Sequence, residues 1–319
     1  MRIAITTSSF AEFSREPLDL LAAAGCEIVL NTLGRKLKPE ETIALLVDCE
    51  GVVAGTEIYD SAVFAALPRL RVLSRCGVGM DSVDQEAARN LGVKVLNTPF
   101  GPTRAVAELT VGLALDLLRQ VTRMDRELRG NAWKKRMGSL LAGKKVGVVG
   151  FGRIGQATAE LFAALGCEIG YADVHPIAAC PIYAHCMDLP GLLAWADIVT
   201  LHCSKPASAK SGGCAVLGEA ELAAMRPGSW LINCGRGGLV DEDALVRALT
   251  SGHLAGAAVD CFDKEPYSGP LAAADTAILT PHIGSYAKEG RAKMETDAVK
   301  NLLTALGLDW GAGQQRVDF

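Results

Sequence analysis

The sequence predicts an α/β protein that folds as two doubly wound parallel-sheet domains with a cleft between them. Short apolar runs alternate with amphipathic helical segments along the chain, which is typical of parallel strand–helix–strand units. Two such series occur, separated by a long helical segment over Thr103–Leu128. A glycine-rich turn begins only at Gly150, so the length of a whole domain precedes it. With 319 residues, half of them apolar, the chain can form two cores of ordinary size.

The first series occupies about the first hundred residues. Amphipathic segments such as Pro17–Ala24 and Ser61–Leu67 separate its apolar runs, so the strands should be parallel and covered by helices. The predicted strands are Ile3–Thr6, Glu27–Leu30, Gly51–Ala54, Arg71–Ser74 and Lys94–Leu96.

The second series begins near Lys145, after a helix predicted over Thr103–Leu128 and a polar break. Its predicted strands are Val146–Val149, Glu168–Ala172, Ile198–His202, Trp230–Asn233, Ala257–Asp260 and Ala277–Thr280. A last helix over Ala287–Leu306 has no strands of its own left and should return to the first domain. The predicted domains are therefore 1–100 with 287–319, and 101–286.

Composition excludes several classes of function. The formal net charge is −4 and the isoelectric point is about 5.8, without a long Lys/Arg run, so nucleic acid is not an expected partner. Ten scattered cysteines form no Cys-x-x-Cys pair, so no metal site is predicted, and free thiols fit a reducing cytoplasm. The N-terminus resembles no signal peptide and no apolar stretch could cross a bilayer, so we expect a cytoplasmic protein without membrane partners.

The glycine turn predicts a dinucleotide site in a Rossmann-type domain. A buried strand pattern leads directly into Gly150-Phe151-Gly152-Arg153-Ile154-Gly155, and a helix follows. The first glycine permits a tight turn, the second lets a pyrophosphate approach the backbone, and the third lets helix and strand pack closely. The helix N-terminus then offers free N–H groups to the phosphates.

The next predicted strand ends at Asp173, 18 residues after Gly155. A carboxylate there accepts hydrogen bonds from the ribose hydroxyls and repels a 2′-phosphate, so the sequence favours NAD and disfavours NADP. The alternative is that Asp173 is only a turn residue, since Asp is common at strand ends.

Three titratable residues follow the ends of consecutive predicted strands, namely Arg236, Glu265 and His282. In doubly wound folds these loops form the ligand crevice. The set suits hydride transfer on a hydroxy acid: His takes the hydroxyl proton, the carboxylate orients the ring and stabilises its protonated form, and Arg holds the carboxylate or polarises the carbonyl. Taken singly, the His could be structural and the Arg a surface turn residue.

With these residues the chain resembles the D-isomer-specific 2-hydroxyacid dehydrogenases, most closely the phosphoglycerate dehydrogenase-like branch. The resemblance covers about Val52 to Lys288. It rests on Arg75-Cys76-Gly77-Val78-Gly79-Met80-Asp81, Asn97-Thr98-Pro99, Ala107-Glu108-Leu109-Thr110, the glycine turn, Asn233–Asp241, Asp260–Pro266 and Pro281–Ser285.

The resemblance implies roles for individual residues and a flavodoxin-like substrate domain beside the NAD domain. Arg236 is similar to the substrate-binding arginine, Glu265 to the paired carboxylate and His282 to the acid/base. The implied cofactor contacts include Thr103, Cys234, Gly235 and Asp260, and the implied substrate loop is Arg75, Cys76, Gly77, Val78 and Gly79. A homodimer formed through the NAD domain and its long helix is also implied.

The chain departs from that branch at three places. Val53-Ala54-Gly55 stands where such enzymes often carry a phosphate-binding Arg, so half of a phosphate clamp is expected to be missing although Arg75 is present. The chain ends at Phe319, so serine feedback through a C-terminal regulatory domain is not expected. Ser204–Leu217, with Gly212-Gly213-Cys214, is unusual and could reshape the cleft wall.

The sequence thus predicts an NAD-dependent enzyme that interconverts a D-2-hydroxy acid and its 2-keto acid, with 3-phosphoglycerate among the candidate substrates. Two alternatives stay open at this point. One is an enzyme for another small acid, such as glyoxylate, hydroxypyruvate or phosphite. The other is a non-catalytic protein that senses NAD(H).

Overall fold

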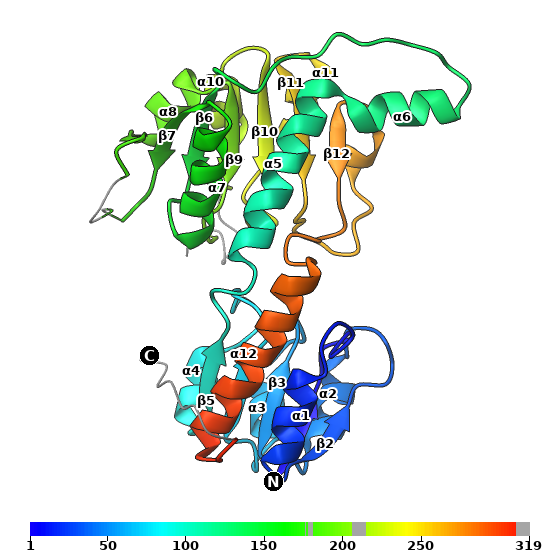
Figure 1. The fold of residues 1–319 in the computed structure, drawn as a ribbon, viewed down its shortest axis with the longest axis vertical. Helices are drawn as coiled ribbons and strands as arrows, with labels where there is room; N and C mark the ends of the chain where they lie inside the picture. Colours follow the sequence, from blue (N-terminus) through cyan, green and yellow to red (C-terminus); the bar gives the residue numbers. More distant parts are fainter. Residues whose placement is uncertain (176, 178–180, 206–214, 311–319) are drawn as a thin grey trace. The chain divides into compact units, whose positions relative to one another are not determined.

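The computed structural model describes residues 1–175, 177, 181–205 and 215–310. It divides into two compact units, each built on one parallel sheet (Figure 1). Unit 1 comprises Met1–Pro102 together with the chain from Tyr286 onward, and unit 2 comprises Thr103–Ser285. None of the helices in the described residues combines the length and hydrophobicity needed to cross a bilayer.

Unit 1 is a five-stranded parallel sheet in the order β2-β1-β3-β4-β5, the flavodoxin-like order. Its elements are β1 (Arg2–Ile5), α1 (Glu16–Ala23), β2 (Glu27–Leu30), α2 (Pro39–Leu46), β3 (Gly51–Ala54), α3 (Ser61–Ala65), β4 (Val72–Arg75), α4 (Gln85–Asn90), β5 (Lys94–Asn97) and α12 (Lys288–Leu306).

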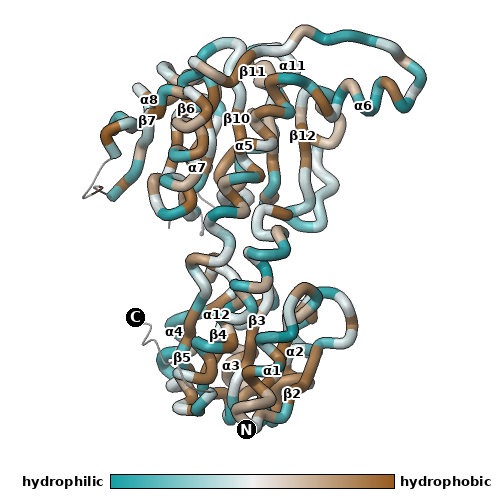
Figure 2. The backbone as a smooth tube through the Cα atoms, in the orientation of Figure 1, coloured by the Kyte–Doolittle hydropathy of each residue, from teal (hydrophilic) through white to brown (hydrophobic). Residues whose placement is uncertain are grey.

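Helices cover both faces of this sheet because the strands are apolar on both sides, as the brown strands of Figure 2 show. One face packs on α1 and α12, through residues such as Leu21, Met294 and Val299. The other packs on α2, α3 and α4, through residues such as Leu46 and Phe64. The last helix therefore completes the core of the first sheet.

Unit 2 is a seven-stranded parallel sheet in the order β12-β11-β10-β9-β6-β7-β8. The order reverses at β6, whose two neighbours are β7 and β9, and such a switch point is where dinucleotides bind. Its elements are α5 (Thr103–Arg119), α6 (Val121–Arg129), β6 (Lys145–Val149), α7 (Arg153–Ala164), β7 (Glu168–Ala172), β8 (Ala184–Cys186), α8 (Leu189–Trp195), β9 (Ile198–Leu201), α10 (Glu219–Ala224), β10 (Ser229–Asn233), α11 (Glu242–Thr250), β11 (Leu254–Val259), a 3₁₀ turn (Pro270–Ala273) and β12 (Ala277–Leu279).

Two separate cores flank the second sheet. Helices α5 and α7 contribute Leu113, Leu117 and Phe162 to one, and α8, α10 and α11 contribute Leu192, Leu222 and Leu245 to the other. Several helices begin where an Asp side chain accepts a hydrogen bond from the first turn, which satisfies an otherwise unpaired N–H. These caps are Asp60, Asp84, Asp188 and Asp241.

The single helix predicted over Thr103–Leu128 is wrong, because the structure contains two helices there. Gln120 lies in the left-handed region at φ 52°, which ends α5 and redirects the chain. The Asp116 carboxylate then accepts hydrogen bonds from the backbone N–H of Thr122, at 2.8 Å, and from its hydroxyl, so it holds the start of α6. Strand β8 was not among the predicted strands, because it is only three residues long with His185 and Cys186 exposed.

Candidate active site

The glycine turn lies at the switch point of the unit 2 sheet, between β6 and α7. Gly150 has a φ of 88°, a conformation that favours glycine. A Cβ on Gly155 would collide with the carbonyl oxygen of Gly150, whereas a Cβ on Gly152 would meet nothing within 4 Å. The turn is therefore tightly packed where Gly155 meets Gly150, and it is open at Gly152. An opening there is what the approach of a pyrophosphate to the backbone requires. Arg153 and Ile154 begin α7 directly after this opening.

Asp173 follows β7 and is bonded to the glycine turn itself. Its Oδ2 accepts a hydrogen bond from Phe151 N at 2.6 Å, and its Oδ1 accepts one from His175 N at 2.8 Å. Each carboxylate oxygen can accept more than one hydrogen bond, so ribose hydroxyls can still be received. Gln156, which sequence reasoning missed, donates to the Phe151 carbonyl oxygen at 2.8 Å and fixes the other side of the turn.

His202 directly follows β9 and is half-buried. Its Nε2 lies 2.9 Å from Thr200 Oγ1, and its buried Nδ1 has no hydrogen-bond partner among the residues that the structure describes. Burial disfavours the imidazolium and lowers the pKa of His202 from 6.5 to about 3. This histidine is therefore neutral at physiological pH.

The carboxyl ends of β10, β11 and β12 lie side by side, because Asn233 pairs with Val259 and Val259 with Leu279. The loops that carry Arg236, Glu265 and His282 start at these ends. Asn233 shapes the first loop: its Oδ1 accepts a hydrogen bond from Gly235 N at 3.1 Å, and its Nδ2 donates to the Arg236 carbonyl oxygen at 3.0 Å. The half-buried Arg236 side chain donates from Nη1 to the Gly235 carbonyl oxygen at 2.8 Å.

His282 and Glu265 form a direct pair. Nδ1 of His282 lies 3.0 and 3.1 Å from the two carboxylate oxygens of Glu265, and both side chains are partly exposed. Glu265 Oε1 also accepts a hydrogen bond from Phe262 N at 3.1 Å, which fixes the orientation of the carboxylate. A carboxylate at Nδ1 keeps the proton of neutral imidazole on that atom, which leaves Nε2 free to accept a proton from a ligand.

Asp260 holds the loop that carries His282. Its fully buried carboxylate accepts hydrogen bonds from Thr280 Oγ1 at 2.7 Å, Ile283 N at 2.8 Å and Gly284 N at 2.9 Å. Between these anchors His282 has a φ of 55°, a left-handed conformation that a non-glycine residue adopts only when its surroundings enforce it. Asp260 and Thr280 are thus positioning residues for His282.

Two buried thiols lie at the same edge of the sheet. Cys261 has its pKa raised by burial, and the negative charge of Glu265 and the positive charge of Arg236 act on it in opposite directions. Cys234 is also buried, and burial raises its pKa to about 12. Its thiol is therefore protonated, and the residue contributes its backbone groups and a small apolar side chain to this region.

In unit 1, the predicted substrate loop follows β4. Gly77 N donates to Thr98 Oγ1 at 2.7 Å, and Asn97 Nδ2 donates to the Val78 carbonyl oxygen at 2.9 Å. Cys76 is buried, and burial raises the pKa of its thiol to about 12. The backbone N–H groups of Val78 and Gly79 donate to no acceptor in the described part of the chain, so they are the two amides available to an anion.

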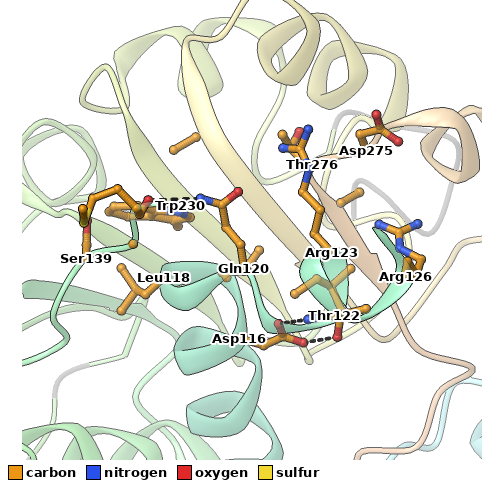
Figure 3. A pocket seen from close by; sticks show the side chains of 16 residues that line it. Asp116, Leu118, Gln120, Thr122, Arg123, Arg126, Ser139, Trp230, Asp275 and Thr276 are labelled. Carbon is orange, nitrogen blue, oxygen red and sulfur yellow. Dashed lines mark hydrogen bonds between the residues drawn. The ribbon is translucent and has the colours of Figure 1, made fainter. Parts of the chain in front are cut away.

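A pocket of about 130 Å³ lies elsewhere in unit 2, at the amino ends of β10, β11 and β12 (Figure 3). Trp230, Ala255 and Ala277 come from those strand ends, and Gln120 and Arg123 come from the start of α6. This is the sheet edge opposite the glycine turn. The pocket therefore does not take part in the chemistry of the site.

Residues 111–284 match the family model described as the D-isomer specific 2-hydroxyacid dehydrogenase NAD binding domain. The chain belongs to the D-isomer specific 2-hydroxyacid dehydrogenase family. The match lies within unit 2, so unit 2 is the NAD-binding domain and NAD is the cofactor. The glycine turn and its opening above Gly152 fit this cofactor. The described residues contain no cluster of His, Cys, Asp and Glu arranged to hold a metal ion.

Relatives of known sequence or structure agree with this assignment. A D-3-phosphoglycerate dehydrogenase of Mycobacterium bovis is 37% identical over 260 residues, which is 80% of this chain and 48% of the relative. The chain thus spans about half the length of the curated relatives it matches. A Thermus thermophilus protein of solved structure is 35% identical, with a TM-score of 0.86 over 96% of this chain and 97% of that one. A glyoxylate reductase from Paecilomyes thermophila is 27% identical, with a TM-score of 0.84 over 96% and 95% of the two chains.

Proposed function

We propose that this protein is an NAD-dependent D-2-hydroxyacid dehydrogenase, in which unit 1 binds the substrate and unit 2 binds NAD. The observation that carries the proposal is the His282–Glu265 pair, at 3.0 Å, on loops that follow neighbouring strands and share their sheet edge with Arg236. Family membership and the NAD-binding domain support it.

In the proposed reaction the substrate hydroxyl faces Nε2 of His282. NAD, when bound, supplies the acceptor for the hydride that leaves C2. As the hydride leaves, Nε2 takes the hydroxyl proton, and the Glu265 carboxylate at Nδ1 stabilises the imidazolium that forms. In the reverse direction the imidazolium returns the proton to the oxygen of the keto acid.

Arg236 supplies positive charge at the same carboxyl edge of the unit 2 sheet. Its guanidinium can bind the substrate carboxylate through two donors, or polarise the carbonyl oxygen. In unit 1 the free amides of Val78 and Gly79 offer a second place for a carboxylate. The cofactor contacts that we assign are Thr103, Gly150, Gly152, Arg153, Ile154, Gly155, Asp173, Cys234, Gly235 and Asp260. Beside Val78 and Gly79, the substrate contacts in unit 1 are Arg75, Cys76 and Gly77.

We further propose that the protein is a cytoplasmic homodimer. The eight cysteines among the described residues are all free, which fits a reducing compartment. Large apolar side chains are exposed around α5, α6 and the segment that follows, at Leu115, Val121, Leu128, Trp133, Met137 and Leu140. Such a concentration is unusual for a free surface and supports association through this region of unit 2.

The test is a steady-state assay with purified protein, NADH and a panel of 2-keto acids that includes 3-phosphohydroxypyruvate, hydroxypyruvate, pyruvate and glyoxylate. We expect turnover of at least one of them, with NADH strongly preferred over NADPH because of Asp173. Binding of NADH without oxidation by any member of the panel would support an NAD(H)-sensing protein instead.

A further inference from the structure

The pocket at the amino edge of the unit 2 sheet has no part in the proposed reaction (Figure 3). It has a volume of about 130 Å³. The end of α5, the start of α6, the segment 137–139 and the amino ends of β10, β11 and β12 line it. All of these elements belong to unit 2, so the pocket is formed within one compact unit.

Part of the pocket lining is apolar. Leu117 and Leu118 come from the end of α5, Trp230 from β10, and Ala277 and Ile278 from β12. Leu117, Leu118 and Ala277 are also core residues of unit 2, and each is at most 8% exposed. A cavity of about 150 Å³ with apolar walls can hold a benzene molecule. The pocket is therefore of a size to receive an apolar group no larger than a benzene ring.

The charged residues of the lining are balanced in sign. They are Arg123, Arg126, Asp116 and Asp275. Arg123 and Arg126 lie three positions apart on α6, so their side chains share one face of this helix. Figure 3 shows the Arg123 side chain extending toward Thr276, the neighbour of Asp275. The Asp116 carboxylate is already occupied, because it accepts two hydrogen bonds from the start of α6.

The other three charged groups do not neutralise one another. Arg123 Nε lies 3.6 Å from Glu127, but that carboxylate is held more closely by Arg136, at 2.5 Å. Arg126 and Asp275 make no hydrogen bond or ion pair with any residue that the structure describes. Two guanidinium groups and a carboxylate thus line one small pocket without pairing with each other. A ligand that carries both signs of charge would complement them.

We infer that this pocket binds a zwitterionic α-amino acid with an apolar side chain. The guanidinium groups of Arg123 and Arg126 bind its carboxylate, and the Asp275 carboxylate binds its ammonium group. Its side chain packs against the apolar part of the lining, which includes Trp230. A ligand with only one of the two charges leaves part of this set unpaired and binds less tightly. The inference does not rest on the proposed dehydrogenase activity, because the pocket lies at the edge opposite the glycine turn.

Isothermal titration calorimetry of the full-length protein with L-phenylalanine and L-leucine tests the inference. We expect at least one of them to bind with a Kd of about 1 mM or lower. The deaminated acid and the decarboxylated amine of the better-bound amino acid should each bind at least tenfold more weakly, since each lacks one charge. Glycine, which keeps both charges and lacks the side chain, should also bind at least tenfold more weakly. Saturating NADH should change the Kd of the amino acid less than twofold.

The variant that tests the position of the ligand is Arg126→Gln. Because Arg126 is exposed and makes no ion pair in the described part of the chain, its replacement should leave the fold intact and weaken binding of the amino acid at least tenfold. The matched control is Arg129→Gln, which removes the same charge from the same helix. Arg129 pairs with Asp125 at 2.8 Å and does not line the pocket, so this variant should bind within twofold of the wild type.

Failure of both amino acids to bind, which is the result expected if a second copy of the chain fills the pocket, would overturn the inference. It would also be overturned if NADH displaced the amino acid, or if Arg126→Gln and Arg129→Gln bound it equally well. Turnover of 2-keto acids by the same preparation tests the proposed function separately, so the failure of one proposal can be told from the failure of the other.

Discussion

At the scale of single residues, the geometry of His282 determines what the site can do. The Glu265 carboxylate faces Nδ1, and the Asp260 carboxylate holds the backbone that directly follows His282. Both contacts are made by side chains of unit 2 alone. The imidazole is therefore pre-oriented before any ligand binds, which is how positioned groups lower a reaction barrier.

The kinetic roles of the pair can be separated by substitution. We expect His282→Gln to lower kcat by about 10²- to 10⁴-fold, because the proton acceptor is lost, while the Kd for NADH changes less than threefold. Glu265→Gln should lower kcat by at least about tenfold, since the imidazolium loses its counter-charge. His253→Gln serves as the control, because His253 directly precedes β11 and so lies at the opposite, amino edge of the sheet. Near wild-type turnover in His282→Gln would refute the assigned role.

The half-buried His202 predicts a pH dependence of stability. Its pKa is about 3 in the folded protein and 6.5 when unperturbed, so only the unfolded chain takes up this proton between those values. The stability that neutral His202 contributes is fully present above pH 6.5 and falls as the pH drops below it. From pH 7.5 to about pH 5, His202→Gln should therefore lose about 1–2 kcal/mol less unfolding free energy than the wild type.

Urea titrations at the two pH values measure this difference. His185→Gln is the matched control, because His185 is exposed on β8 and its replacement should follow the wild-type curve. A His202→Gln variant with the same pH dependence as the wild type would show that the histidine is protonated, or solvated, in the folded state.

The sequence allowed the candidate site residues to be chosen, but it did not allow most of the hydrogen bonds that position them to be predicted. The pattern of charged residues after consecutive strands was enough to predict that Glu265 and His282 lie close together, because parallel strands end at one edge. The partners Gln156, Thr280 and Asn233 were missed as positioning residues. Their hydrogen bonds depend on side-chain directions in turns, and no periodicity in the sequence reports these directions.

At the scale of elements, the β6–turn–α7 unit shows how a close backbone approach builds a binding site. Gly155→Ala places a Cβ against the Gly150 carbonyl oxygen, so helix and turn must separate. We expect NADH affinity to fall at least tenfold, measured by fluorescence titration, because the turn that receives the pyrophosphate is displaced.

Gly112→Ala is the control for this substitution. Gly112 lies in α5 with nothing within 4 Å of its Cβ position, so alanine there should leave NADH binding unchanged and stabilise the helix by up to about 1 kcal/mol. Equal NADH affinities in the two variants would mean that the glycine turn does not contact the cofactor.

The observed boundaries of helices and strands agree with those predicted from the sequence where burial determines them. They differ from the prediction where a local hydrogen bond ends one element and starts the next. The strands of both sheets agree closely with the apolar runs, since a buried parallel strand must be apolar on both faces. The break at Gln120 could not be seen in the helical periodicity, which continues on both sides of it. It depends on a left-handed residue and on the Asp116 contacts to Thr122.

At the scale of the whole molecule, the two units differ in how the chain builds them. All buried residues of the two unit 2 cores lie between Val106 and Ala277. Unit 1 instead needs α12, whose Met294, Ala298 and Leu302 are at most 2% exposed in its core. The chain must therefore be synthesised to its last helix before the first sheet can be covered.

This difference predicts how fragments behave. Residues 103–285 alone should fold cooperatively and bind NADH within about tenfold of the full-length affinity, because no core side chain is missing. Residues 1–102 alone should not give a cooperative thermal transition, since one face of their sheet is bare. Calorimetry of both fragments and NADH titration of residues 103–285 test this prediction. Failure of residues 103–285 to fold alone would mean that unit 2 depends on unit 1 for its stability.

The most direct test of the central claim is oxidation of D- and L-enantiomers of the same 2-hydroxy acids with NAD⁺. The enantiomers of glycerate, lactate and 2-hydroxyglutarate suit this purpose, with the appearance of NADH as the readout. The proposed site predicts NADH formation with at least one D-acid, no comparable rate with its L-enantiomer, and loss of the reaction in His282→Gln. A rate that favours the L-acid, or that survives in His282→Gln, would contradict it.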